Sequence, residues 1–98
     1  MAEFLLLMHS DYDLSGQKED WELYLAKLEA AGVLRGGSAI GAGLCVRREG
    51  HPAGLSKTIV GYIKIEAQNL LKAKSLLLGN PAFEAGGTVE IRELLTTS

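Results

Sequence analysis

The strongest constraint on the fold of this chain is the order of its hydrophobic segments, some of which have the pattern of a β-strand and others the spacing of an α-helix. Phe4–His9 is a short run that is apolar on both faces until its end, which is typical of a buried β-strand. From Gln17 to Ala31 the apolar residues recur at helical spacing, and Gly32 follows where a left-handed residue would end the helix. Thr58–Glu66 then alternates in the way that predicts another strand.

The second half of the chain continues with a helix and a strand. Asn69 can cap a helix over Leu70–Leu78, which Gly79 and then Pro81 would end. Thr88–Leu94 is predicted as the last strand, because its apolar and charged residues alternate.

The centre of the chain is rich in glycine. The glycines from Gly32 to Gly43 make any strand there short or irregular. Leu44–Arg48 alternates weakly and is predicted as an edge strand, whose arginines would discourage edge-to-edge pairing. Glu49–Gly54 is predicted as a turn or mobile loop.

These elements follow the order β-α-β-β-α-β, with an extra strand or bulge in the glycine-rich centre. Right-handed crossovers then place both helices on the same face of one antiparallel sheet, which is the ferredoxin-like α+β arrangement. Its central strand is Phe4–His9, flanked by Thr58–Glu66 and Thr88–Leu94. A length of 98 residues fits a single domain over residues 1–98.

The composition narrows the class of protein further. Hydrophobic residues make up 47% and charged residues 22% of the chain, which excludes disorder, and a single cysteine excludes a disulfide scaffold. A net charge of −2 argues against a nucleic-acid partner. No apolar run approaches the ~18–20 residues that cross a bilayer, and Phe4–Met8 lacks the flanks of a signal peptide. We therefore expect a cytoplasmic protein with no membrane partner.

Two helices on one face leave the other face of the sheet uncovered. Leucines and a tyrosine gathered there should not face water, and their burial against a second copy would stabilise so small a domain. We therefore predict a homodimer with its sheets facing each other. The residues expected on this face are Leu5, Leu7, His9, Val60, Tyr62, Lys64, Glu90 and Arg92.

His9 is the main candidate for chemistry on that face. It ends the central strand, and histidine titrates near neutral pH, as a general acid or base should. Asp11, two residues further on, can orient the ring from the loop. We predict His9 and Asp11 as catalytic residues and Tyr62 and Glu90 as ligand-binding residues. The alternative is that His9 only caps the strand end with one hydrogen bond.

The remaining candidates favour structural roles. His51 lies in a Gly/Pro loop and is expected to be solvated, and Cys45 is expected to pack. Two histidines and one cysteine far apart have no metal-ligand spacing, so we expect neither a metal nor a cofactor. Gly36-Gly37 does not join a strand to a helix, which argues against a phosphate-binding loop. The apolar face of the first helix is predicted to be core: Trp21, Leu25 and Leu28.

Several segments, in order along most of the chain, form a familiar pattern: Phe4–His9, Leu28–Leu34 with Gly36-Gly37, Gly61–Ala67 and Gly86–Arg92. Together they resemble the YCII-related family, particularly its DGPF-type branch. The resemblance implies a dimeric α+β barrel, related in fold to muconolactone isomerase-like and monooxygenase-like small proteins. It also implies a His–Asp pair in the enzymes of the family, for which His9 with Asp11 is the match by residue type.

One segment departs from that pattern. The branch carries Asp-Gly-Pro-Phe before the Gly-Tyr strand, whereas Glu49–Lys57 here lacks both the aspartate and the phenylalanine, and no aspartate follows Asp20. Two classes of function therefore stay open. One is a cofactor-free enzyme or small-molecule-binding protein that acts in the His9 cleft on an aromatic or lactone-like molecule. The other is a non-catalytic dimerisation or regulatory module.

Overall fold

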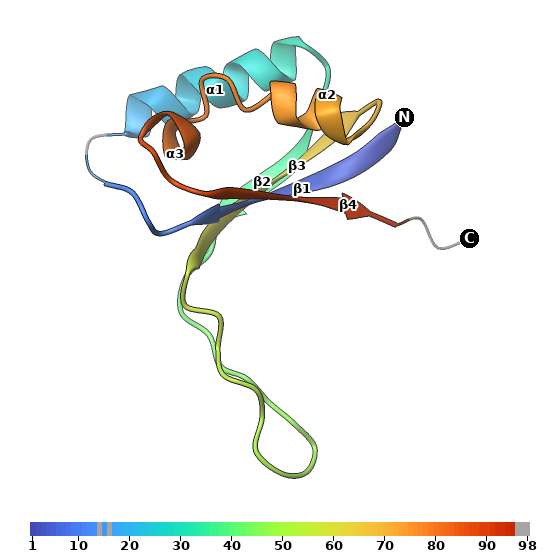
Figure 1. Ribbon diagram of the computed structural model, residues 1–98. Coiled ribbons are helices and arrows are strands. Elements are labelled where there is room, and N and C mark those ends of the chain that lie inside the picture. The colour runs from blue at the N-terminus through green and yellow to red at the C-terminus, as the bar shows by residue number, and fades with distance from the viewer. Residues whose placement is uncertain (14, 16, 96–98) are drawn as a thin grey trace.

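The computed structural model describes residues 1–13, 15 and 17–95. Four strands form one antiparallel sheet: β1 (Ala2–His9), β2 (Leu34–Ala39), β3 (Ile59–Ala67) and β4 (Val89–Leu94). Their order in the sheet is β2-β3-β1-β4, so β1 is central between β3 and β4 as predicted. Three helices lie on one face (Figure 1): α1 (Lys18–Ala30), α2 (Leu70–Ser75) and α3 (Pro81–Glu84). The ferredoxin-like α+β arrangement is therefore confirmed.

The core lies between the helices and the sheet. Alternate residues of β1 are buried there, and β3 adds Ile63, Ile65 and Ala67. From the helical side, α1 contributes Tyr24 and Leu28. The segment from α2 to α3 adds Ala73, Leu77 and Ala82. Among the described residues, no helix is long and apolar enough to span a membrane. The buried residues of β1 are Phe4, Leu6 and Met8.

Residues at the ends of the helices act as the sequence predicts, except at Pro81. Gly32 has a φ of 75°, and the backbone N–H of Val33 donates to the Leu28 carbonyl over 3.1 Å, closing the end of α1. The side chain of Asn69 accepts from the Lys72 amide and caps α2. However, α2 ends at Ser75, and Pro81 begins the separate short helix α3 at a position where its missing N–H costs nothing.

The predicted edge strand Leu44–Arg48 is wrong, because the edge strand is β2. The β2–β3 ladder ends with the pair Ala39 and Gly61, followed by a hydrogen bond from the Ile40 amide to the Val60 carbonyl over 3.0 Å. Beyond this point residues 40–58 leave the sheet as a long arm without helix or strand (Figure 1). We call this segment the arm.

The residues on the uncovered face of the sheet are those that the sequence predicts, except for Val60. Leu5, Leu7 and His9 are half-buried and alternate with the buried residues of β1. Tyr62 and Glu90 both pair with Leu7, one on each side. Val60 is the exception.

A β-bulge explains why Val60 does not join Tyr62 on that face. Met8 pairs with Gly61 but His9 pairs with Ile59, so Val60 is an extra residue in β3. Its side chain packs against the core from the helical side. The bulge therefore reverses the direction that strict alternation predicts.

Candidate functional site

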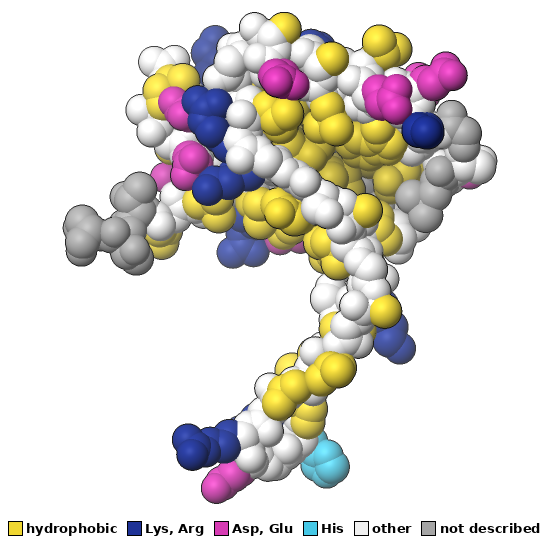
Figure 2. Space-filling model, turned by 180° about the vertical axis from the view of Figure 1, so that it is seen from behind, with side chains coloured by type: hydrophobic (Ala, Val, Ile, Leu, Met, Phe, Trp, Pro, Cys, Tyr) yellow, Lys and Arg dark blue, Asp and Glu magenta, His cyan; other side chains and the backbone are white. Residues whose placement is uncertain are grey.

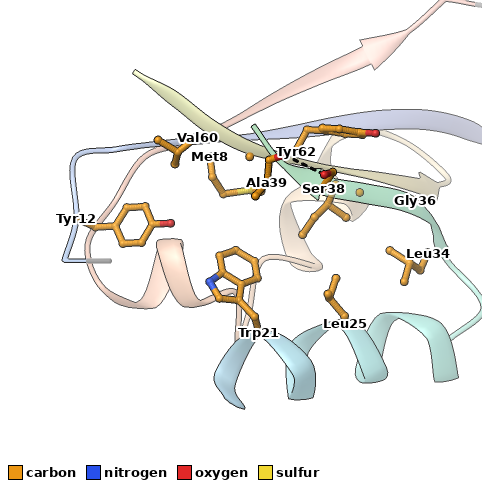
Figure 3. A pocket seen from close by; sticks show the side chains of 13 residues that line it. Met8, Tyr12, Trp21, Leu25, Leu34, Gly36, Ser38, Ala39, Val60 and Tyr62 are labelled. Carbon is orange, nitrogen blue, oxygen red and sulfur yellow. Dashed lines mark hydrogen bonds between the residues drawn. The ribbon is translucent and has the colours of Figure 1, made fainter. Parts of the chain in front are cut away.

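A pocket of about 630 Å³ opens between α1 and the β2–β3 half of the sheet. Trp21 and Leu25 rise from α1 toward the sheet, and Met8 and Val60 approach from the strands (Figure 3). Figure 2 shows hydrophobic side chains gathered between the helical layer and the sheet edge. Trp21 and Leu25, predicted as core, are only half-buried and line this pocket, whereas Leu28 is fully buried.

The sequence of β2 explains why the space is empty. The strand reads Leu-Arg-Gly-Gly-Ser-Ala, so after Leu34 it offers α1 no large apolar side chain. At Gly37 a Cβ atom would lie 2.8 Å from the Tyr62 carbonyl oxygen, so the close approach of β2 to β3 requires glycine there. Small residues and close strands therefore leave a gap under Trp21 and Leu25 that the described side chains do not fill.

Two polar groups are available to a molecule in this pocket. The Tyr12 hydroxyl points into it, and the indole ring of Trp21 faces it from α1 (Figure 3). Neither group hydrogen-bonds within the described part of the chain. Burial, and then the nearby Asp11 carboxylate, raise the pKa of Tyr12 above its usual value, so at neutral pH its hydroxyl is a donor. The ring of Trp21 is held by Tyr24 at a centroid distance of 6.2 Å in an edge-to-face contact.

The predicted site residues lie on the other face of the sheet. His9 Nε2 lies 3.1 Å from Glu90 Oε1, and Arg92 Nη1 donates to Glu90 Oε2 over 3.1 Å. The hydrogen bond with His9, and then that from Arg92, lower the pKa of Glu90. An ionised carboxylate can only accept, so the N–H at Nε2 of His9 donates to Glu90, and this contact leaves Nδ1 as the unused ring nitrogen.

The partner that orients His9 is thus Glu90 and not Asp11. Both Asp11 oxygens accept from Thr88, with the amide at 2.8 Å and the hydroxyl at 2.6 Å. The hydroxyl and then the amide lower the pKa of Asp11. This carboxylate fixes the loop after β1 to the start of β4, and its catalytic role stays a prediction.

Tyr62 shares the uncovered face with His9 and Glu90. Its strand passes the pocket, but its ring points to the other side of the sheet (Figure 3). The structure therefore separates two candidate sites. One is the apolar pocket under α1, and the other is the His9–Glu90 pair on the opposite, uncovered face of the sheet. Cys45 and His51 lie on the arm and join neither. In the part of the chain that is described, no three potential ligands gather around a metal position.

The sequence analysis did not identify Tyr12 as a pocket residue, and it predicted Trp21 and Leu25 to be core residues, whereas all three line the pocket. A usable signal was present: the small-residue run from Gly36 to Ala39 cannot fill the space beneath a helix that carries a tryptophan. Periodicity alone predicts that a side chain faces the sheet, but not whether the strand opposite is large enough to meet it.

No protein-family model matches this chain, and no curated protein matches it. A solved structure is similar: 5-chloro-2-hydroxyhydroquinone dehydrochlorinase (TftG) from Burkholderia phenoliruptrix AC1100, in complex with 2,5-dihydroxybenzoquinone. The TM-score is 0.61 at 17% sequence identity, covering 99% of this chain and 96% of that chain. The two chains share a fold. At this identity the likeness is one of architecture, and membership of the YCII-related family stays a prediction.

Proposed function

We propose that this protein binds a small, flat and mostly apolar molecule in the pocket under α1. The observation that carries the proposal is an open apolar space with two unused hydrogen-bond donors, at Tyr12 and Trp21. Its volume of about 630 Å³ lies in the usual range for ligand sites. An aromatic ring with oxygen substituents fits this lining, because the ring would contact Trp21 and Leu25 while its oxygens accept from the donors.

The structural neighbour supports the same ligand class. TftG is described with 2,5-dihydroxybenzoquinone, a single ring that carries oxygen substituents. Hydroxylated quinones, phenols and aromatic acids are therefore the first compounds to test, followed by lactones.

The only tryptophan of the chain provides the assay, because Trp21 lines the pocket. Binding is expected to change Trp21 fluorescence in a saturable way. Leu25→Asn is expected to weaken binding roughly tenfold, since a fully buried leucine side chain is worth about 1.5–3 kcal/mol and 1.4 kcal/mol is tenfold in Kd.

Leu23→Asn is the matched control for this measurement. Leu23 lies on the same helix but is 71% exposed, so its replacement should leave the Kd unchanged. No saturable response from any compound, or equal binding by both variants, would contradict the pocket and favour the non-catalytic module.

We further infer that two copies associate through the uncovered sheet face. Leu5 and Leu7 lie side by side with Tyr62 there, and apolar side chains on a sheet face are stabilised by covering. The dimeric state is a proposal that the Leu7 variant described in the Discussion tests.

A second candidate function is acid–base catalysis between the two sheets, and the His9–Glu90 contact favours it. A carboxylate that orients one ring nitrogen leaves the other free to move a proton, as in many general bases. His9→Gln is expected to slow protein-catalysed exchange of the C–H protons of a small molecule bound on the His9 side of the sheet, in D₂O, by roughly 100-fold or more, measured by NMR.

His51→Gln is the control for that experiment, because it removes the other histidine of the chain from an exposed position on the arm. Equal exchange rates in both variants, or no exchange with the wild type, would remove the catalytic candidate and leave the binding pocket as the function.

A further inference from the structure

The arm (residues 40–58) makes few hydrogen bonds to the rest of the described chain. Its root is held by the bond from Ile40 to Val60 and by a bond from the Ser10 amide to the Thr58 carbonyl over 2.7 Å. Between these points the described hydrogen bonds include only one, from Arg47 to the His51 carbonyl. Gly50, with a φ of 79°, turns the chain at the tip. Such a segment loses conformational entropy with few contacts in return.

The arm also carries apolar side chains that no described residue covers. Leu44 is 78% exposed and Val46 is 81% exposed, and Ile40 and Leu55 are also exposed. Figure 2 shows hydrophobic side chains along the arm and charged side chains at its end. Several exposed apolar side chains on one projecting segment are a candidate surface for contact with another molecule.

The direction of the arm indicates which molecule this is. The helices lie on one side of the sheet, and the arm projects from the opposite side (Figure 1). That side carries the uncovered apolar face of Leu5 and Leu7. A second copy seated on this face would stand directly beside the arm, so the interface and the arm are continuous.

The arm is long enough to pass the sheet of that second copy. From Ile40 to the turn at Gly50 an extended chain spans up to about 30 Å, whereas packed sheets lie about 10 Å apart. The tip therefore reaches the level of the helices of the second copy. The two longer helices differ in charge. On α1 the exposed acidic residues outnumber the lysines, whereas the charged residues of α2 are all lysines. The exposed charged residues of α1 are Glu19, Asp20, Glu22, Glu29, Lys18 and Lys27.

We propose that each arm clasps the second copy of the sheet-to-sheet dimer, with Leu44 and Val46 packed against its side and Arg47 and Arg48 beside its α1. The tip carries Arg47 and Arg48 with one acidic residue, Glu49, and this net positive charge favours α1 over the lysine-bearing α2. The proposal rests on the dimer proposed above and adds to it a role for the arm.

Cys45 makes the clasp directly testable, because it is the only cysteine and lies between Leu44 and Val46. Equal amounts of ¹⁴N- and ¹⁵N-labelled protein are mixed, labelled on Cys45 with a maleimide-benzophenone and irradiated. The expected products join a light arm peptide to a heavy peptide from Lys18–Ala30, or the reverse. Cross-links within one chain only would overturn the clasp.

A paired set of variants measures the energetic effect. Leu44→Ser with Val46→Ser is expected to raise the dimer Kd at least tenfold in sedimentation equilibrium, without change in the circular dichroism spectrum. Leu70→Ser with Leu71→Ser, on exposed positions of α2, should leave the Kd unchanged. A wild-type dimer with an unaltered Kd in the arm variant overturns the clasp alone. A monomeric wild type overturns both the clasp and the sheet-to-sheet dimer.

Discussion

Replacing Phe4 by alanine is expected to lower the free energy of unfolding by about 3–5 kcal/mol, the usual cost of truncating a buried phenylalanine. Phe4 is 1% exposed and lies in the central strand, paired with Ile65 of β3 and Glu93 of β4. Hydrogen bonds on both sides of β1 prevent the strand from moving into the cavity. In a domain of this size the loss corresponds to a fall in Tm of about 12 °C or more.

Phe83→Ala is the matched control, since Phe83 is the other phenylalanine of the chain and is 42% exposed. Its backbone amide keeps the hydrogen bond to the Asn80 side chain, so α3 keeps its cap. We expect a loss of less than about 1 kcal/mol, as for most surface positions. Both values come from denaturant unfolding at one fixed protein concentration, because the proposed association would also stabilise the folded state. Equal losses would show that the core is not centred on β1.

Replacing Leu7 by arginine is expected to raise the Kd of the proposed dimer by roughly 100-fold or more. Leu7 lies at the middle of the uncovered face, between Tyr62 and Glu90. In a sheet-to-sheet interface an arginine there loses its hydration, and breaking or stranding a buried charge costs several kcal/mol. In the free chain the same arginine faces solvent beside Glu90, so the fold is retained. Sedimentation equilibrium over a concentration series measures the change.

Leu71→Arg adds the same charge at a position of α2 that is 77% exposed, and it should leave the Kd of the proposed dimer unchanged. If the Leu7 variant associates as tightly as the wild type, the uncovered face is not the interface. The pocket under α1 would not be affected by that result, because it lies on the opposite face of the sheet.

The two candidate sites have different physical origins. The pocket exists because β2 supplies small residues and glycine opposite Trp21 and Leu25. The His9–Glu90 pair exists because β1 and β4 pair in a register that places Glu90 opposite Leu7. His9 lies two residues after Leu7 on the same face of β1, within reach of the Glu90 side chain. A molecule bound in the pocket is therefore separated from His9 by the sheet itself. This arrangement is why ligand binding and proton exchange are tested with different variants.

Much of the architecture followed from the sequence. The apolar run of β1, the glycine that ends α1, the Asn69 cap of α2 and the alternation in β4 are local signals, and the structure confirms each of them. The predicted edge strand Leu44–Arg48 failed because weak alternation says nothing about whether a neighbouring strand is within reach. Pro81 failed as a terminator because the same fixed φ that ends one helix can begin another.

The sequence by itself determined β1, α1, β3, the start of α2 and β4, and the side of β1 on which His9 lies, because these depend on caps and on periods of two and 3.6 residues along the chain. Only the tertiary structure decided what each side chain meets. The bulge at Val60, the choice of Glu90 over Asp11 as the partner of His9, and the pocket beneath Trp21 all depend on the register and spacing between segments far apart in sequence. Residue patterns report the direction of a side chain, whereas packing across the sheet fixes its neighbours and the space left between them.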